Sequence, residues 1–302
     1  MQYTFKVKKE TQTTLDRFLA SHARVSLEEA CELVRFGAVW VDRTRETDGE
    51  RTLEAGEAVT VHIPRYGVRR YYETDPERIL YRDPWLLAYD KEAGIPSQPT
   101  PYDGYNNVFE ALKRWLGSEP CAGGLPPGVE RKDAGGSDTL ALHHRLDMAV
   151  SGLMIFALST RANAPLFEAF RDRQVEKKYR AVVCGEPGED SWVERAAIGR
   201  QGGRYLCVEP GRGKEAETGF RVLRRAHGRA LVEARPKTGR THQIRLHLAL
   251  RGLPILGDRQ YGGLPYPRCM LHAQSLNLPH PVKSEPLVIE ATLPDAFEGA
   301  LV

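Results

Sequence analysis

The first part of the chain, residues 1–64, alternates between strand-like and helix-like patterns of apolar positions. The patterns predict strands at residues 3–7, 38–41 and 58–63, and helices around residues 15–19 and 27–34. Ser26 is an expected helix N-cap with Glu29 three residues later, which predicts a capping box at the start of the second helix. Gly37 ends that helix, and Pro64 ends the last strand. Residues 1–64 are therefore predicted to form a small α/β domain, followed by a linker at residues 65–76.

From about residue 77 the pattern is dominated by strands. We expect strands at residues 85–90, 151–158, 177–184, 204–209, 217–224 and 229–235, and helices at residues 105–116, 160–172 and 241–250. Because the helices follow no regular βαβ rhythm, residues 77–302 are predicted to form an α+β domain. Its central sheet should be mainly antiparallel, with a cleft across it. Residues 117–137, rich in Gly and Pro, should be a long loop insertion.

Composition and charge limit the classes of function. Of the 302 residues, 41% are hydrophobic and 27% are charged, which suits a buried core. No run reaches the roughly 20 apolar residues that cross a bilayer, and the N-terminus lacks the apolar core of a signal peptide, so we expect a cytoplasmic protein. Residues 1–64 hold 9 Lys/Arg and 11 Asp/Glu, a charge of −2, while the remaining 34 and 29 give +5. An anionic partner should therefore bind mainly the second part.

Motifs for metals and nucleotide cofactors are missing from the sequence. The five cysteines are scattered and form no CxxC pair, which argues against a disulfide framework and a cysteine zinc site. His242 and His247 are five residues apart on a predicted helix and should point to different faces. HExxH, GxxxxGK[ST] and GxGxxG do not occur. We therefore expect no metal and no cofactor.

Three segments of the larger domain resemble the RluA-type RNA pseudouridine synthases. Residues 144–153, HRLDMAVSGL, are similar to the family pattern HRLD-x-x-T-S-G-L. Residues 177–183, KKYRAVV, are similar to K-x-Y-x-A-x-V, and residues 238–248, TGRTHQIRLHL, lead into LPILGDRQYG at 253–262 and LHA at 271–273. The three segments occur in the family's order between about residues 79 and 293. The resemblance implies a pseudouridine synthase-like fold.

The first domain resembles the S-four-like (alpha-L) RNA-binding domain that often precedes this catalytic domain. Residues 14–19 and 35–42 carry that resemblance. The pattern departs from the family at residues 25–29, VSLEE, where basic residues are typical; Glu28 and Glu29 would repel phosphate. In the larger domain, Val150 replaces the usual Thr, and residues 91–94, KEAG, replace Lys-Pro-Ala-Gly.

The resemblance assigns three residues to catalysis. Asp147 is the reacting carboxylate, as nucleophile or base. Arg240 matches the active-site arginine that binds the carboxylate; a guanidinium is always charged and suits a two-pronged contact. Tyr179 stacks on the uracil and relays a proton. The resemblance leaves open attack on the sugar, attack on the ring and deprotonation of the sugar.

Other residues carry weaker implications. Arg145 fills the vacancy left by a flipped-out base or contacts phosphate, and Leu271 packs against the base. Arg17, Arg35 and Arg43 of the small domain are either solvated surface or RNA contacts, and the sequence favours neither. We expect Arg245 on a solvated helix face, and we interpret three histidines as structural: His144, His242 and His247.

The sequence thus predicts an isomerase that converts specific uridines of ribosomal or transfer RNA to pseudouridine, and that acts as a monomer. The reaction exchanges no electrons and no group, so it needs no redox cofactor. One alternative is a catalytically inactive RNA-binding or RNA-chaperone protein of the same fold. Another is a protein-interaction role for the acidic residues 1–64. The presence of Asp147, Tyr179 and Arg240 favours the enzyme.

Overall fold

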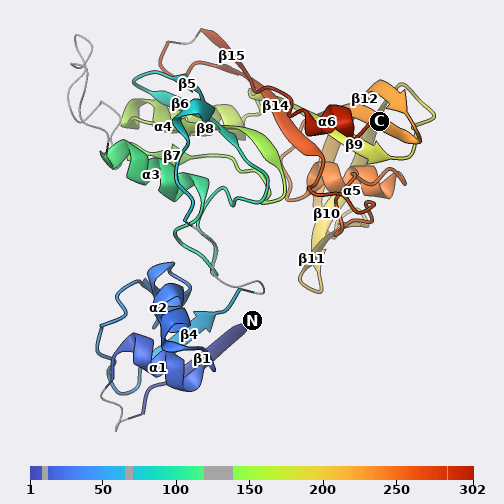
Figure 1. Cartoon of the computed structure of the whole chain (residues 1–302). Coiled ribbons are helices and arrows are strands. Elements are labelled where there is room, and N and C mark those ends of the chain that lie inside the picture. The colour runs from blue at the N-terminus through green and yellow to red at the C-terminus, as the bar shows by residue number, and fades with distance from the viewer. Residues whose placement is uncertain (9–12, 65–70, 119–138, 284) are drawn as a thin grey trace. The chain divides into compact units, whose positions relative to one another are not determined.

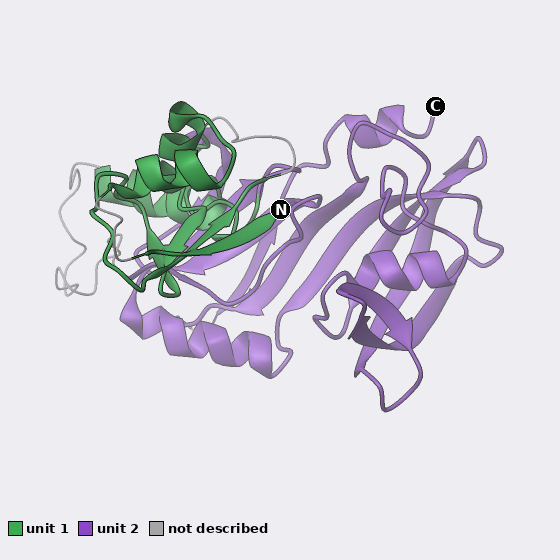
Figure 2. Ribbon diagram, turned by 90° about the horizontal axis from the view of Figure 1, so that it is seen from below, with its two compact units in different colours: residues 1–74, 96–118 green, residues 75–95, 119–302 purple. Residues whose placement is uncertain are grey.

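The computed structural model describes residues 1–8, 13–64, 71–118, 139–283 and 285–302. It divides into two compact units (Figure 2). The first comprises residues 1–74 and 96–118, and the second comprises residues 75–95 and 119–302. The sequence-based boundaries at residues 64 and 77 stay a prediction. No described helix is long and apolar enough to cross a membrane.

The first unit contains a four-stranded antiparallel sheet in the order β1-β4-β2-β3, together with three helices. Its elements are β1 (Gln2–Lys6), α1 (Leu15–His22), α2 (Leu27–Arg35), β2 (Val39–Val41), β3 (Thr44–Glu46), β4 (Ala58–His62) and α3 (Val108–Ser118). The predicted capping box is confirmed: Ser26 Oγ accepts from Glu29 N at 3.1 Å, and Ser26 N donates to Glu29 Oε2 at 2.9 Å. The sequence missed β3, which follows a two-residue turn in which Asp42 and Arg43 both have positive φ.

The second unit is built on a large sheet in the order β11-β10-β12-β13-β9-β14-β8-β6-β5, with β15 added to β14 and β7 to β8 (Figure 1). Every pairing is antiparallel except that of β14 with β8. The predicted α+β fold with a mainly antiparallel sheet is thereby confirmed. The sequence missed β5, β7, β10, β14 and β15, and residues 119–137 of the predicted loop lie outside the described residues.

The elements of the second unit follow in this order along the chain: η1 (Pro76–Arg78), β5 (Ile79–Arg82), β6 (Leu86–Lys91), β7 (Ala141–Leu142), β8 (Ser151–Ala157), α4 (Thr160–Arg171), β9 (Glu176–Cys184), β10 (Ser191–Gln201), β11 (Arg204–Val208), β12 (Lys214–Ala226), β13 (Arg229–Pro236), α5 (Gln243–Leu250), β14 (Leu271–Pro279), β15 (Pro286–Glu290) and α6 (Ala296–Gly299). The predicted helix at 105–116 corresponds to α3 of the first unit.

The strand β8 lies inside this sheet, between β14 and β6, and all seven of its residues are buried. Apolar residues of α4 pack in one hydrophobic cluster with it, among them Leu166 with Leu153 and Ile155. At Gly152, φ is +114°, and a Cβ atom would lie 2.3 Å from the backbone oxygen of Ala273 on β14. Only glycine allows the two parallel strands to approach so closely, which explains the SG pair that follows the HRLD segment.

The helix α5 covers the face of the sheet to which Thr218 of β12 points. Its first residue, Gln243, donates from Nε2 to Glu217 O at 3.0 Å and to Thr218 Oγ1 at 2.9 Å. Leu246 packs in a cluster with Ile198 and Ala216 of strands β10 and β12. These contacts fix the start and the rotation of α5, and therefore which of its side chains face the loop that joins β7 to β8.

Candidate active site

Asp147 lies in the loop between β7 and β8, and this loop is anchored at its next residue. The backbone oxygen of Met148 accepts a hydrogen bond from Gly94 N at 2.7 Å and another from Lys91 Nζ at 3.4 Å. Lys91 is fully buried, and its Nζ also donates to the backbone oxygens of Glu92 and Ile95, each at 2.8 Å. Burial lowers the pKa of Lys91 to about 7, against the opposing effect of nearby carboxylates that include Asp147. The end of β6 thus holds the Asp147 loop in place.

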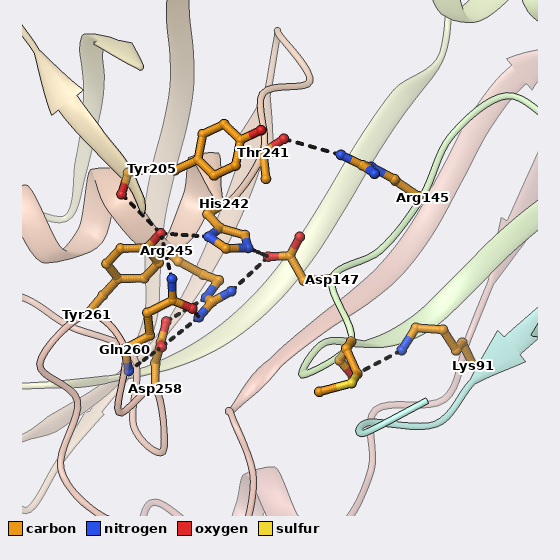
Figure 3. Close-up of polar contacts among 11 residues, drawn as sticks. Lys91, Arg145, Asp147, Tyr205, Thr241, His242, Arg245, Asp258, Gln260 and Tyr261 are labelled. Carbon is orange, nitrogen blue, oxygen red and sulfur yellow. Dashed lines mark hydrogen bonds and ion pairs between the residues drawn. The ribbon is translucent and has the colours of Figure 1, made fainter. Parts of the chain in front are cut away.

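Arg245, not Arg240, binds the carboxylate of Asp147 (Figure 3). Arg245 Nη1 donates to Asp147 Oδ2 at 3.0 Å, and the arginine side chain is only 5% exposed. The expectations that Arg240 pairs with Asp147 and that Arg245 lies on a solvated face are therefore both wrong. The physical reason is that α5 begins at Gln243, so that Arg245 is on the helix and turned inward, whereas Arg240 belongs to the preceding turn.

Asp258 fixes the guanidinium of Arg245 on its other side. Arg245 Nε donates to Asp258 Oδ2 at 2.7 Å and Nη2 donates to Asp258 Oδ1 at 2.8 Å, a two-pronged contact with a nearly inaccessible carboxylate. Gln260 Oε1 accepts from Nη2 at 3.1 Å. The two carboxylates raise the pKa of Arg245 above its already high value, although burial acts in the opposite direction. One rigid cation therefore joins Asp258 to Asp147.

Arg240 makes different contacts at the start of the same segment. Its Nε donates to the backbone oxygen of Glu215 at 3.1 Å, and its backbone N donates to Gln243 Oε1 at 3.0 Å. Among the described residues, Asp147 forms its ion pair with Arg245, and His242 Nε2 lies 3.7 Å from the same carboxylate oxygen. Arg240 is therefore tied to β12 and to the start of α5 rather than to the carboxylate.

His242, expected to be structural, lies beside Asp147. Its Nε2 is 3.7 Å from Asp147 Oδ2, and its Nδ1 is 2.6 Å from the hydroxyl of Tyr261. Burial lowers the pKa of His242, although the negative charge of Asp147 acts in the opposite direction. The imidazole is therefore mainly neutral at neutral pH.

Tyr179 lies on β9, half-buried, where its backbone pairs with Ala234 of β13 and with Ala273 of β14. Burial raises the pKa of its hydroxyl strongly, and the negative charge of Asp147 raises it further. The hydroxyl is therefore within electrostatic reach of Asp147 and keeps its proton at neutral pH. In that state it can donate a hydrogen bond.

Arg145 and Leu271 differ in their exposure. Arg145 is exposed, and its Nη2 donates to Thr241 Oγ1 at 3.4 Å, so it joins the Asp147 loop to the segment before α5. Leu271 begins β14 and is 3% exposed, paired with Ala181 on β9. Contacts of either side chain with RNA stay a prediction.

The three arginines predicted for the small domain are all exposed and come from different elements. Arg17 lies on α1, Arg35 ends α2 with its guanidinium 5.1 Å from the ring centre of Tyr71, and Arg43 lies in the turn before β3. Their binding of RNA stays a prediction.

His144 and His247 have the contacts of structural residues. His144 Nε2 accepts from Ile155 N at 2.9 Å, and its ring stacks on Phe170. His247 Nδ1 lies 3.0 Å from Thr218 Oγ1. Burial lowers the pKa of His144 to about 3 and that of His247 to about 4, so both rings are neutral at neutral pH.

The sequence interpretation missed Lys91, His242, Arg245 and Asp258. All four lie in or next to the segments that carry the family resemblance, so their positions could have been noticed. Their roles could not, because a motif does not say which of two arginines turns inward. Within the described ranges, no three His, Cys, Asp or Glu side chains are grouped so that they could hold a metal ion. The expectation that no metal or cofactor is needed stays a prediction.

Comparisons with known proteins agree with the resemblance. The family model described as RNA pseudouridylate synthase matches residues 86–250. A Zymomonas mobilis protein named ribosomal large subunit pseudouridine synthase D is 31% identical over 302 residues, covering 94% of this chain and 91% of that protein. A Rickettsia typhi protein named ribosomal large subunit pseudouridine synthase C is 31% identical over 231 residues, covering 74% of this chain and 70% of that protein.

Solved structures show the same likeness. A human protein titled RNA pseudouridylate synthase domain containing 4 superposes with a TM-score of 0.60 at 26% identity, covering 74% of this chain and 92% of that chain. Another, titled RNA pseudouridylate synthase domain containing 1, gives a TM-score of 0.57 at 23% identity, covering 76% and 90%, and supports the fold alone. The residues matched by the family model include Asp147, Tyr179 and Arg245.

Proposed function

This chain belongs to the RNA pseudouridylate synthase family, and from that premise we propose that it isomerises uridine in RNA to pseudouridine with Asp147 as the reacting carboxylate. The observation that carries the assignment of the site is the ion pair between Asp147 Oδ2 and Arg245 Nη1, 3.0 Å long, in the loop of the HRLD segment. An aspartate held by a buried, doubly anchored arginine has a fixed orientation toward a substrate.

The isomerisation breaks the bond between ribose C1′ and uracil N1 and forms a bond between C1′ and uracil C5. The proton on C5 is lost and N1 gains one, so atoms and electrons balance without a co-reactant. Asp147 is the group that attacks or deprotonates the nucleoside in the first half. Its anchored loop and the clamp of Arg245 and Asp258 support a role that demands an accurate position.

Tyr179 is proposed to contact the base in the same site. Its half-buried ring on β9 offers an aromatic face to a flipped-out uracil, and its protonated hydroxyl offers a hydrogen-bond donor. Arg145, exposed and joined to Thr241, is proposed to contact the strand from which the base has left. Arg240 is proposed to bind backbone phosphate or to support the start of α5, and no longer to bind Asp147.

The proposed substrate class is ribosomal RNA of the large subunit, in the cytoplasm. The names of two relatives that cover most or much of this chain support it, one a synthase D and the other a synthase C of the ribosomal large subunit. The sequence alone favoured neither ribosomal nor transfer RNA, so an experiment must distinguish these two substrates. A monomeric enzyme stays our expectation.

The test is a map of pseudouridines in ribosomal and transfer RNA from cells with and without the gene. One or more sites in large-subunit RNA should lose the modification without the gene, and the full chain should restore them. The Asp147→Asn chain, expressed to the same level, should not restore them. Sites lost only from transfer RNA would correct the substrate class. If removal of the gene abolished no pseudouridine site, so that neither chain had a site to restore, the inactive RNA-binding alternative would be favoured.

A further inference from the structure

The two carboxylate oxygens of Asp147 have unequal surroundings (Figure 3). Oδ2 accepts from Arg245 Nη1 at 3.0 Å and also faces His242 Nε2 at 3.7 Å. Among the residues that the structure describes, no hydrogen bond or ion pair joins Oδ1 to a partner. One oxygen is therefore held, and the other is available to a substrate.

The second nitrogen of His242 is held by Tyr261. The Tyr261 hydroxyl lies 2.6 Å from His242 Nδ1 and 3.2 Å from the backbone oxygen of Tyr205, and it accepts from Gln260 Nε2 at 3.3 Å. The hydroxyl has one hydrogen to donate: it goes either to the backbone oxygen of Tyr205, so that Nδ1–H donates to the hydroxyl, or to Nδ1, the nearer of the two atoms. When Nδ1 accepts, the proton of a neutral imidazole sits on Nε2, the atom that faces Asp147.

The backbone at His242 supports the same orientation. With φ at 59°, His242 adopts a left-handed conformation that is unfavourable for residues other than glycine, directly before α5. Its ring lies between the rings of Tyr205 and Tyr261, at centre-to-centre distances of 5.7 and 5.6 Å. Such a conformation persists only where the surroundings determine it, and at this position they aim the ring at the carboxylate.

We propose that the Tyr261 hydroxyl donates to Nδ1 and that His242 is a positioning residue for Asp147: its Nε2–H faces Oδ2 from 3.7 Å, beside the guanidinium of Arg245 that binds this oxygen, and the two groups leave Oδ1 toward the uridine. This inference rests on the proposed function in so far as Asp147 is the reacting group. His242 and Arg245 both belong to the motif segment TGRTHQIR, and both face the same oxygen of Asp147. They are three residues apart, His242 just before the start of α5 and Arg245 just after it.

The charges around His242 predict how pH acts on this arrangement. The charged and titratable groups that face it are Asp147, Asp258, Arg245, Arg145 and Tyr261. When the imidazole is protonated in acid, Oδ2 is paired with two cations instead of one, and the carboxylate becomes a weaker base. Activity should therefore fall on the acid side as His242 becomes protonated.

The first experiment reads the imidazole directly and needs no activity. The full chain is labelled with ¹⁵N-histidine, and His242 is assigned by its absence from the His242→Gln spectrum. We expect the tautomer with the proton on Nε2, and in Tyr261→Phe a mixture of both tautomers. In Asp147→Asn the titration midpoint of His242 should fall, because a nearby negative charge is lost. A proton on Nδ1, or an unchanged midpoint, would overturn the proposal.

The second experiment separates positioning from packing. Gln can place an amide N–H near the position of Nε2, whereas Leu fills a similar volume without a donor. His242→Leu should lower kcat about threefold to tenfold, the effect of one lost polar contact, with KM within twofold, and His242→Gln should recover at least half of that loss on a logarithmic scale. Equal losses in the two variants would overturn the proposal. The matched control is His227→Leu, an exposed histidine that also has a positive φ and should keep full kcat.

The same assays distinguish a wrong positioning role of His242 from a wrong proposed function. A wild-type chain that makes no pseudouridine in any RNA refutes the proposed function, and the ¹⁵N spectra still decide whether Tyr261 and Asp147 orient His242. An active wild type with equal kcat in the Gln and Leu variants refutes the positioning role alone.

Discussion

Residues 1–64 of the first unit and the large sheet of the second unit place their charges differently. In the first, ion pairs form between neighbours in sequence at the surface, such as Arg51 with Glu57, whose side chains are 32% and 12% exposed. In the second, Arg245 and Asp258 are 5% and 2% exposed, and Arg245 reaches Asp147, which is 98 residues away in sequence. A short-range pair can be read from a sequence pattern. A pair made across a sheet cannot.

Burial also changes what each pair contributes. An exposed ion pair is screened by water and typically contributes less than about 1 kcal/mol. Forming a buried pair requires both charges to lose their hydration. Removing one partner then leaves the other charge buried and unpaired, which lowers the stability of the fold by about 3–5 kcal/mol. We therefore expect substitutions around Asp147 to have large effects and substitutions of the exposed small-domain arginines to have small ones.

The largest effect should come from Asp147→Asn. The amide keeps the shape of the side chain but removes its charge and basicity, so pseudouridine formation should fall at least about 10³-fold. RNA affinity should stay within a few-fold, because phosphate contacts elsewhere supply most of it. Single-turnover assays and filter binding on one RNA measure both quantities. A variant with wild-type turnover would leave the assignment of the site without support.

The next effect should separate Arg245 from Arg240. Arg245→Lys keeps the charge, but an ammonium group cannot bind Asp258 with two nitrogens and Asp147 with a third. We expect kcat to fall about 10- to 100-fold, the effect of losing one or two charge-assisted hydrogen bonds. The matched substitution Arg240→Lys should change kcat less than threefold. The reverse order of the two effects, measured at equal folded fraction, would restore Arg240 as the partner of the carboxylate.

A third effect should appear in the stability of the two parts in acid. The pKa values of His247 and His272 fall to about 4 in the folded chain, because both rings are buried. The unfolded value is about 6.5, so between pH 6.5 and 4 the unfolded chain takes up protons that the folded chain does not. Stability is then lost as pH falls through that window, by at most about 3 kcal/mol for each histidine.

Hydrogen exchange, corrected for the intrinsic rate at each pH, locates this loss. Amides of β13 and β14 should lose protection between pH 6.5 and 4 before those of β1 and β4. In the small domain, His62 has a pKa lowered by partial burial, and its contribution should be smaller. If both sheets lost protection at the same pH, the two parts would not differ in their stability in acid, and this prediction would be wrong.

The smallest effect should come from the arginines of the small domain. Replacing Arg17, Arg35 and Arg43 together by Gln should weaken RNA binding less than about tenfold, or about 1.4 kcal/mol. The slope of log affinity against log salt should change by less than about one, because few phosphates would be neutralised there. A change of two or three would show that all three arginines bind phosphate and that the acidic helix α2 does not prevent it.

Local patterns in the sequence were sufficient for the fold class but not for every strand. The capping box of Ser26 and Glu29, the buried strand β8 and the excess of strands over helices each depend on neighbours in sequence, and each could be predicted. The missed strands have a physical explanation too. The residues of β10 alternate weakly in polarity because charged side chains occur on both of its faces: Glu194 pairs with Arg251 after α5, and its neighbour Arg195, which points to the opposite face, pairs with Glu217.

The sequence by itself determined the fold class, the family and the position of Asp147 in its motif. Only the tertiary structure decided which arginine binds that carboxylate, and that Lys91, His242 and Asp258 belong to the same site. The physical reason is that apolar periodicity records which side of an element is buried, whereas a hydrogen bond depends on which segments the sheet brings together. The pairing of β14 with β9 and β8, and the rotation of α5 on β12, bring these segments together.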